Sequence, residues 1–472
     1  MGDCSLPSVF SAVERIRVLP RLRGRVARSR VTRVAVPAAT APLVPPPAHR
    51  RVRWVILALL FGVTVINFVD RQTLSVLAPI IRDTFHLSNT QYGTIVSWFQ
   101  LGMVVGEFPM GWLMDRVGVR IGLAGAVVWW SIGNAMHATA GSLWSFRLFR
   151  FWLGTGECAN YSGGNKVVAQ WFPMRERALA IGIFNSASMI GSFIAPFLVI
   201  PIATRYGWRT GFLVPSGLGI LWVIAWWVFY RHPDEHPRLS VEEANYIAAG
   251  RSAATALPPT NRQLLRLKQT WGLMLCRFWV GPVVQFYIYW MPNYFRDVRH
   301  LSVANSSYFN AVTFLFGDIG SVGGGLVAGW LITRGLSVNA ARKSTLSIGA
   351  GLCLLSFAVP LLNSIPLAIA AISVVLLGHT FLSANMFATV SDVFPDSAVA
   401  RVTGLTGVAS GLSGIFFPYL TGVIVDRFSY LPVFFMAALM PLVGVAILFL
   451  TVDRHRPVAF VSIGTGHGLD AG

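Results

Sequence analysis

Long apolar stretches recur along this chain from about Arg53 to about Thr451, and they constrain its fold more than any motif does. A helix needs roughly 20 residues to cross a hydrocarbon core of about 30 Å. Because lipid offers no hydrogen bonds to the backbone, such stretches fold as helices. Of the 472 residues 54% are hydrophobic and 12% are charged, whereas soluble domains carry about 25% charged residues. The sequence therefore predicts an all-α polytopic membrane protein.

We expect twelve transmembrane helices in two six-helix bundles, a plan on which many transporters are built. The predicted spans are 53–80, 91–113, 120–140, 143–166, 178–204, 209–230, 270–295, 305–332, 344–363, 365–391, 402–425 and 430–451. The predicted parts are a disordered basic tail at 1–50, bundles at 51–230 and 270–452, a polar central loop at 231–269, and a C-terminal tail at 453–472. For the first tail, an organelle transit peptide or an unused upstream start are alternatives.

Lysine and arginine collect in cytoplasmic loops and therefore indicate the orientation. With a cytoplasmic N-terminus, the cytoplasmic face holds the central-loop arginines together with Arg116, Arg120, Lys166, Arg175, Arg177, Arg334, Arg342, Lys343, Arg401, Arg454 and Arg456. The opposite face holds Arg82, Arg147, Arg205, Arg209, Arg296, Arg299 and Arg427. Both termini are therefore predicted to be cytoplasmic. This topology signal and the basic tail account for most of the net charge of +19, so no nucleic-acid partner is expected.

Among the charged residues inside predicted spans, four stand out: Asp70 and Arg71 in the first, Arg150 and Glu157 in the fourth. An ionisable group in a membrane costs from about 3 to more than 10 kcal/mol, so such groups are usually functional. Arg150 and Glu157 are two helical turns apart, about 10.5 Å at 1.5 Å per residue, on one face. A planar guanidinium binds a carboxylate through two parallel hydrogen bonds, which makes Arg150 the preferred candidate for an anionic substrate.

Glu157 is the first candidate for a proton carrier and Asp70 the second. Burial resists ionisation of a carboxyl while a nearby cation favours it, so a conformational change can alter its proton affinity.

Arg71 can pair with Glu157 or with substrate. Adjacent helical residues point about 100° apart, so Asp70 and Arg71 need not share a partner. A static salt bridge between helices is the alternative for Arg71 with Glu157, and a structural role is the alternative for Asp70.

A motif joins the second and third spans: Gly111-Trp-Leu-Met-Asp115-Arg116-Val-Gly118-Val-Arg120. A small residue lets helices approach closely, and a carboxylate beside arginines can form a charge relay that breaks when bundles rock. Degenerate copies follow at 329–335 and 422–427. The motif and its copy six spans later resemble the signature loop of the major facilitator superfamily. Conformational gating is therefore expected of Gly111, Asp115, Arg116, Gly118 and Arg120.

The resemblance is closer along both halves. It is carried by Ile66-Asn-Phe-Val-Asp70-Arg71-Gln-Thr-Leu-Ser75, Phe151-Trp-Leu-Gly-Thr-Gly-Glu157, Lys166-Val-Val-Ala-Gln-Trp-Phe-Pro173, Phe286-Tyr-Ile-Tyr-Trp-Met-Pro292 and His379-Thr-Phe-Leu-Ser-Ala-Asn385. These strings resemble the anion:cation symporter family, in the branch that includes bacterial hexuronate permeases. The resemblance implies that Asp70 and Glu157 couple cations and that Arg71 and Arg150 serve coupling and substrate binding. Departures near the presumed pathway are Phe68, Cys158, Tyr161-Ser162, Gly281 before Pro282, and Val284-Gln285.

Further polar residues inside predicted spans are weaker candidates. His379 and Asn385 can offer hydrogen bonds to substrate hydroxyls from the second half, and Asn160 shares a helix face with Glu157. Hydrogen bonds between helices are the alternative for all three. Glu107 and Arg277 lie near span ends, where a charged side chain reaches the interface by snorkelling.

The predicted function is proton-driven symport of a hexuronate, such as galacturonate or glucuronate, across a bacterial inner membrane. Symport of an aldonate, an aldarate, tartrate or an aromatic carboxylate is the alternative, and sodium coupling stays open. A membrane enzyme or sensor would need a catalytic constellation or a soluble domain, and we find neither, nor a Walker sequence or zinc spacing. A channel is disfavoured as well, because buried acids paired with arginines suit alternating access better than a hydrated ring of like charges. We expect no enzyme activity, no cofactor and no metal, with the lipid bilayer, a small organic anion and protons as partners of a monomer.

Overall fold

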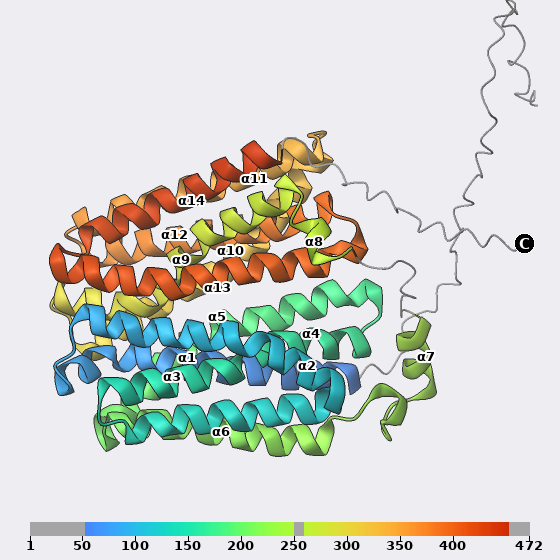
Figure 1. Cartoon of the computed structure of the whole chain (residues 1–472), viewed down its shortest axis with the longest axis horizontal. Helices are drawn as coiled ribbons and strands as arrows, with labels where there is room; N and C mark the ends of the chain where they lie inside the picture. The colour runs from blue at the N-terminus through green and yellow to red at the C-terminus, as the bar shows by residue number, and fades with distance from the viewer. Residues whose placement is uncertain (1–51, 250–258, 453–472) are drawn as a thin grey trace, which may run out of the picture. The chain divides into compact units, whose positions relative to one another are not determined.

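The computed structural model describes residues 52–249 and 259–452, and nearly all of this part is helical (Figure 1). The predicted tails lie outside the described residues. In the first half the helices are α1 Val52–Thr84, α2 Asn89–Met136, α3 Leu143–Glu157, α4 Ala159–Trp171, α5 Met174–Tyr206 and α6 Trp208–Phe229. In the central segment they are α7 Val241–Ala249 and α8 Asn261–Leu264. In the second half they are α9 Lys268–Asp297, α10 Val303–Thr333, α11 Val338–Cys353, α12 Ile365–Val393, α13 Asp396–Arg427 and α14 Leu431–Thr451.

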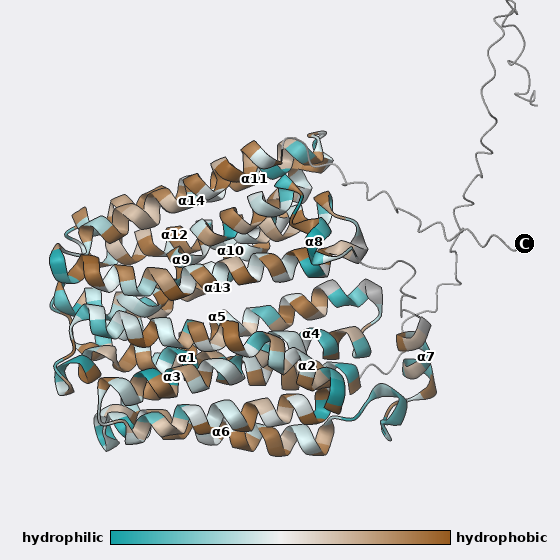
Figure 2. Cartoon of the chain, in the orientation of Figure 1, coloured by the Kyte–Doolittle hydropathy of each residue, from teal (hydrophilic) through white to brown (hydrophobic). Residues whose placement is uncertain are grey.

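The long helices have the length and composition of membrane spans. Among the described residues eight segments qualify: α1, Leu179–Tyr206 of α5, α6, α10, Val338–Leu361 with α11, α12, Arg401–Arg427 of α13, and α14. The two arms of α2, the α3–α4 pair and α9 lie at the other four predicted spans. Figure 2 shows hydrophobic residues along these helices and hydrophilic residues gathered at the helix ends.

The second, third and fourth predicted spans differ in detail from the observed helices. α2 continues through the second and third spans and turns sharply at Gly118, where φ is +78°. A residue with a Cβ is strained at that φ, which explains the glycine. The fourth span is divided into α3 and α4 at Cys158, directly after Glu157, where φ of −57° and ψ of −28° remain helical. The backbone therefore continues in a helical path past Glu157.

The chain direction defines two ends of the described structure. Val52 and Thr451 lie at one end, which we call the terminal end, and the short connections after α1, α9 and α13 lie at the other, the distal end (Figure 1). Each half contains its own tightly packed helices, such as α2 with α3 and α10 with α12. The halves meet where α2 packs on α13, α5 on α10 and α1 on α9.

Ion pairs join the two halves at the distal end. Arg82 Nη1 lies 2.7 Å from Asp297 Oδ2, and Arg296 pairs with Asp83. The Asp426 carboxylate of α13 also accepts hydrogen bonds from the N–H groups of the first residues of α2, Asn89 at 2.9 Å and Thr90 at 2.7 Å. A carboxylate is favourable there because a helix N-terminus presents unpaired N–H groups and a positive dipole end. We call these seven residues the distal clasp.

At the terminal end, the pairs Arg53–Glu176, Lys166–Asp115 and Arg342–Asp392 each lie within one half, and Arg53–Glu243 joins the first half to the central segment. Arg53 is fully buried in the first turn of α1, with Glu176 of α5 at 3.0 Å and Glu243 of α7 at 3.2 Å. The Tyr246 hydroxyl also donates to Glu176 Oε1 at 3.1 Å. The predicted polar loop therefore contains a helix that is fixed to the first half by a buried cation.

We expect Glu243→Ala to lower the free energy of unfolding by about 3 kcal/mol, because removing one partner leaves the buried Arg53 incompletely paired. The measurement is thermal unfolding of the purified protein in detergent. Glu242→Ala is the matched control, since that neighbouring side chain is exposed and its loss should stay within about 0.5 kcal/mol. Equal effects of the two substitutions would contradict a specific role for the buried pair.

We expect Asp426→Ala to open the distal end, because four hydrogen bonds across the halves are lost. A loss of about 1.4 kcal/mol shifts a two-state equilibrium tenfold. The measurement is the distance distribution between spin labels at the exposed distal positions Tyr206 and Leu361, in a background without native cysteines. Longer distances should gain population in Asp426→Ala and not in the control Glu242→Ala. An unchanged distribution would show that the carboxylate does not hold this end closed.

Candidate functional site

The four charges singled out in the sequence come together between α1 and α3. Arg71 donates from Nε to Glu157 Oε2 at 3.0 Å, and its Nη2 lies 2.9 Å from the same oxygen. Glu157 is fully buried, while the Arg71 side chain keeps 12% of its surface exposed. In the structure Arg71 therefore pairs with Glu157, one of its two predicted partners. The second oxygen, Oε1, has no hydrogen-bond partner among the described residues.

Arg150 contacts the backbone of Arg71. Its Nη2 donates to the backbone carbonyl of Arg71 at 3.1 Å, and the residue is 1% exposed. Both guanidinium groups stack on Phe99, at 5.1 Å for Arg71 and 5.4 Å for Arg150. In this conformation Arg71 is thus the more accessible cation, although the sequence favoured Arg150 as the anion ligand.

Asp70 points to a different neighbour, as expected for adjacent helical residues. Asn134 of α2 donates to Asp70 Oδ1 at 2.7 Å and also approaches the carbonyl of Phe212 at 3.3 Å. Asp70 Oδ2 has no hydrogen-bond partner among the described residues. Sequence reasoning missed Asn134, and its one signal was an amide inside a predicted span.

Close packing of α3 on α2 determines where Arg150 and Glu157 lie. Gly154 stands between them in the sequence, and a Cβ added there would clash with the backbone carbonyl of Phe99. A glycine at this position lets the two helices approach, as small residues do in membrane bundles. The approach brings both charged residues of α3 against Arg71 on α1.

The three predicted hydrogen-bonding residues already have partners within the protein. Asn160 exchanges hydrogen bonds with Thr64 of α1, at 3.1 and 3.3 Å. Asn385 donates to Gly324 and Phe381 carbonyls and accepts from Arg342.

His379 contacts the Val280 carbonyl through Nε2 at 3.2 Å, and its buried Nδ1 has no hydrogen-bond partner among the described residues. The structure does not bring Asn385 or His379 into contact with the four charges.

Arg277 of α9 packs against α12. Its guanidinium carbon lies 4.4 Å above the ring of Phe387 on α12, and its Nη1 is buried with no hydrogen-bond partner among the described residues. The residue as a whole is half-buried, and snorkelling stays a prediction for it.

The predicted gating motif forms a different ion pair from the one expected. Asp115 pairs with Lys166 of α4, while Arg116 stacks on Trp112 at 4.4 Å. Arg120 donates to the Trp227 carbonyl at 2.9 Å.

The expected close helix contact at Gly111 is absent in this conformation, because a Cβ there would have no heavy atom outside its own helix turn within 4 Å.

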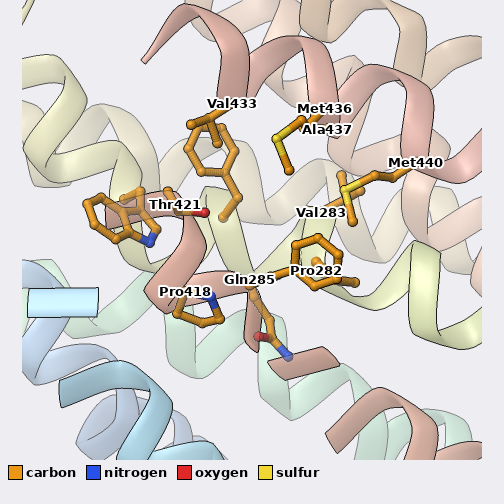
Figure 3. Close-up of a pocket in the computed structure, with 12 residues that line it drawn as sticks. Pro282, Val283, Gln285, Pro418, Thr421, Val433, Met436, Ala437 and Met440 are labelled. Carbon is orange, nitrogen blue, oxygen red and sulfur yellow. The ribbon is translucent and has the colours of Figure 1, made fainter. Parts of the chain in front are cut away.

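A pocket in the second half lies apart from these charges (Figure 3). It lies between α9, α13 and α14, and its lining is apolar apart from Gln285 and Thr421. Figure 3 shows the Gln285 side chain extending away from Met436 and Met440. The pocket contains none of the predicted site residues, so it does not define the site.

Comparisons with known proteins agree with this architecture. The Major Facilitator Superfamily sequence pattern matches residues 60–340 and 319–467. The Hexuronate transporter of Escherichia coli strain K12 is 30% identical over 87% of this chain and 96% of its own length. The Probable L-galactonate transporter of the same strain is 31% identical over 80% of this chain and 84% of its own length.

The fold also matches a solved structure. The crystal structure of a bacterial homolog of the human lysosomal transporter Spinster has a TM-score of 0.69 at 20% identity, covering 86% of this chain and 99% of that one. The helices form the same two-half architecture, and the sequence match spans nearly all of the described residues. This chain belongs to the major facilitator superfamily of membrane transporters.

Proposed function

We propose that this protein is a proton-coupled symporter of an organic anion, most directly a hexuronate, that works by alternating access. The observation that carries the proposal is the buried ion pair between Arg71 and Glu157. The E. coli hexuronate relative supports the choice of substrate. The excess of Lys and Arg at the terminal end supports an orientation with both termini cytoplasmic. The bacterial relative supports a location in a bacterial inner membrane. We place the two halves at 51–230 and 270–452.

The coupling follows from competition for one guanidinium. When Glu157 is ionised, its carboxylate satisfies Arg71. Protonation of Glu157 removes that negative charge and leaves a cation in a poorly hydrated site, which is costly until another carboxylate replaces it. A substrate carboxylate makes the same charge-assisted hydrogen bonds to Arg71. Proton and anion are therefore stable in the site together, and each alone is disfavoured.

The other predicted residues act around this pair. Arg150 holds the α1 backbone at Arg71 and adds positive charge, and Asp70 with Asn134 provides a second protonatable group. His379 offers its unused Nδ1 to a substrate hydroxyl. Asn160 and Asn385 reach substrate only if their present hydrogen bonds between helices exchange. Gly111, Asp115, Arg116, Gly118 and Arg120 lie at the terminal end, where we propose that they serve gating.

A second candidate substrate class is the aldonates, because one relative over 80% of this chain is named a probable L-galactonate transporter. An aldonate also presents one carboxylate and several hydroxyls, so the pair with Arg71 does not separate it from a hexuronate. Sodium coupling remains the alternative to proton coupling.

The test is uptake of labelled galacturonate into proteoliposomes under an inward proton gradient. We expect wild-type protein to accumulate the label and both Glu157→Gln and Arg150→Ala to lose accumulation. Counterflow without a gradient should persist in Glu157→Gln, because a neutral amide leaves Arg71 free for substrate, and should fail in Arg150→Ala. Glu242→Gln, exposed in the central segment, is the control for a lost carboxylate.

Accumulation that follows a sodium gradient in place of a proton gradient would reject proton coupling. Folded wild-type protein that takes up no galacturonate would reject the hexuronate assignment. L-galactonate uptake by the same vesicles would then favour the second candidate.

A further inference from the structure

Asp70 of α1 is a fully buried carboxyl whose hydrogen bonding is incomplete. Its Oδ1 accepts from Asn134 Nδ2 at 2.7 Å, whereas its Oδ2 has no hydrogen-bond partner among the described residues. None of the ion pairs in the described part of the chain includes it. A buried carboxylate is costly unless it is paired and hydrogen-bonded, so the ionised form does not fit these surroundings.

A second contact fixes the orientation of the Asn134 amide. Its Nδ2 also lies 3.3 Å from the backbone carbonyl of Phe212 on α6. A carbonyl oxygen can only accept a hydrogen bond, so the nitrogen of the amide and not its oxygen faces Phe212. The two N–H groups of the amide are then used, one for Asp70 and one for Phe212. The amide oxygen, Oδ1, is buried and has no hydrogen-bond partner within the described residues.

The unused atoms of the two side chains are complementary only when Asp70 is protonated. In the ionised form Asp70 Oδ2 and Asn134 Oδ1 are both acceptors and cannot satisfy each other. A proton on Oδ2 makes that oxygen a donor, and Asn134 Oδ1 belongs to the amide that already donates to Oδ1 of the same carboxyl. A carboxylic acid and a primary amide pair through two such hydrogen bonds in one ring. Protonation therefore satisfies both buried groups.

The charge balance of the proposed anion site agrees with a neutral Asp70. The charged side chains that act on it electrostatically are Glu157 and Arg150 of α3. Glu157 already pairs with Arg71 at 2.9 Å. With Asp70 protonated, the two arginines stand against one carboxylate and the site has one excess positive charge. With Asp70 ionised the sum is zero. The protonated state thus leaves one positive charge for an anionic substrate.

α2 also offers a partner to the ionised form. Trp130 precedes Asn134 by about one helical turn, and its indole lies beside the Asp70 carboxyl. Its buried N–H completes no hydrogen bond within the described residues. His137, about one turn after Asn134, is engaged elsewhere, because its Nδ1 lies 2.9 Å from the Gly133 carbonyl. The helix therefore presents an acceptor for the acid and a donor for the carboxylate.

We propose that Asp70 is protonated in this conformation and that Asn134 is a positioning residue, which binds the acid form through two hydrogen bonds. When the proton leaves to water, the bond from Asp70 Oδ2 to Asn134 Oδ1 breaks, and Trp130 donates to the freed oxygen. This inference rests on the proposed proton coupling for its role in transport. It assigns different states to the two carboxyls, since Glu157 is ionised in its pair with Arg71 while Asp70 is neutral.

The experiment is infrared spectroscopy of the purified protein in lipid vesicles at neutral pH. A protonated carboxyl has a C=O stretching band that is separate from the bands of carboxylates. We expect wild-type protein to show a band that Asp70→Asn loses and Glu157→Gln keeps. Asn134→Leu should shift this band to higher frequency, because the carboxyl loses its hydrogen bonds to the amide. Asn293→Leu removes a buried amide of α9 that has no hydrogen-bond partner among the described residues, and should leave the band in place.

Thermal unfolding provides a second measurement that does not require the Asn134 variant to fold. An asparagine at position 70 has one donor and one acceptor group, so Asp70→Asn can keep both hydrogen bonds to Asn134. We expect its unfolding midpoint to equal or exceed that of wild-type protein. Asp70→Leu leaves the buried amide of Asn134 without its partner and should lower the midpoint.

The outcomes separate this inference from the proposed function, because neither measurement involves transport. A wild-type spectrum without a band that depends on Asp70, or a midpoint of Asp70→Asn as low as that of Asp70→Leu, would overturn the protonated state. A band that stays in place in folded Asn134→Leu would overturn the role of Asn134. Failure of folded wild-type protein to take up galacturonate would reject the proposed function and leave the protonated pair standing.

Discussion

The ion pair between Arg71 and Glu157 is the interaction on which the rest of this structure depends. Two opposite charges in a region without bulk water must satisfy each other, since removing one partner of a buried pair costs about 3–5 kcal/mol. The surrounding residues fix its geometry: Arg150 holds the Arg71 backbone at 3.1 Å, and Gly154 lets α3 approach α2. In the proposed mechanism, such a site is stable when the pair is formed and when a proton and an anion enter together, which is the condition for symport.

α1 connects this pair to the contact between the halves. Ser75, one helical turn after Arg71, donates to the Ile288 carbonyl of α9 at 2.6 Å. Tyr92 of α2 donates to the next carbonyl, that of Tyr289, at 2.8 Å. Further along α1, Arg82 and Asp83 belong to the distal clasp. A single helix therefore connects Arg71 with the distal clasp.

The sequence predicted the spans and the four charges because both depend on composition along the chain. An ionisable group inside an apolar run is visible without coordinates, and its cost indicates function. The partners were less predictable, because they depend on how each helix is rotated about its axis. The sequence therefore favoured Arg150 as the anion ligand although Arg71 is the more exposed of the two, and it did not single out Asn134. Glu243, the buried partner of Arg53, lies in a segment that the sequence predicted only as a polar loop.

Two copies of one motif show why a small residue matters at a moving end. Gly111 and Asp115 of α2 have the same spacing as Gly422 and Asp426 of α13. At the distal end a Cβ on Gly422 would clash with the backbone of Asn89 and Thr90, where Asp426 binds across the halves. At the terminal end the space beside Gly111 is open, and Asp115 pairs within its own half. If the terminal end closes by the same packing, only that closed state requires a residue without a side chain at Gly111.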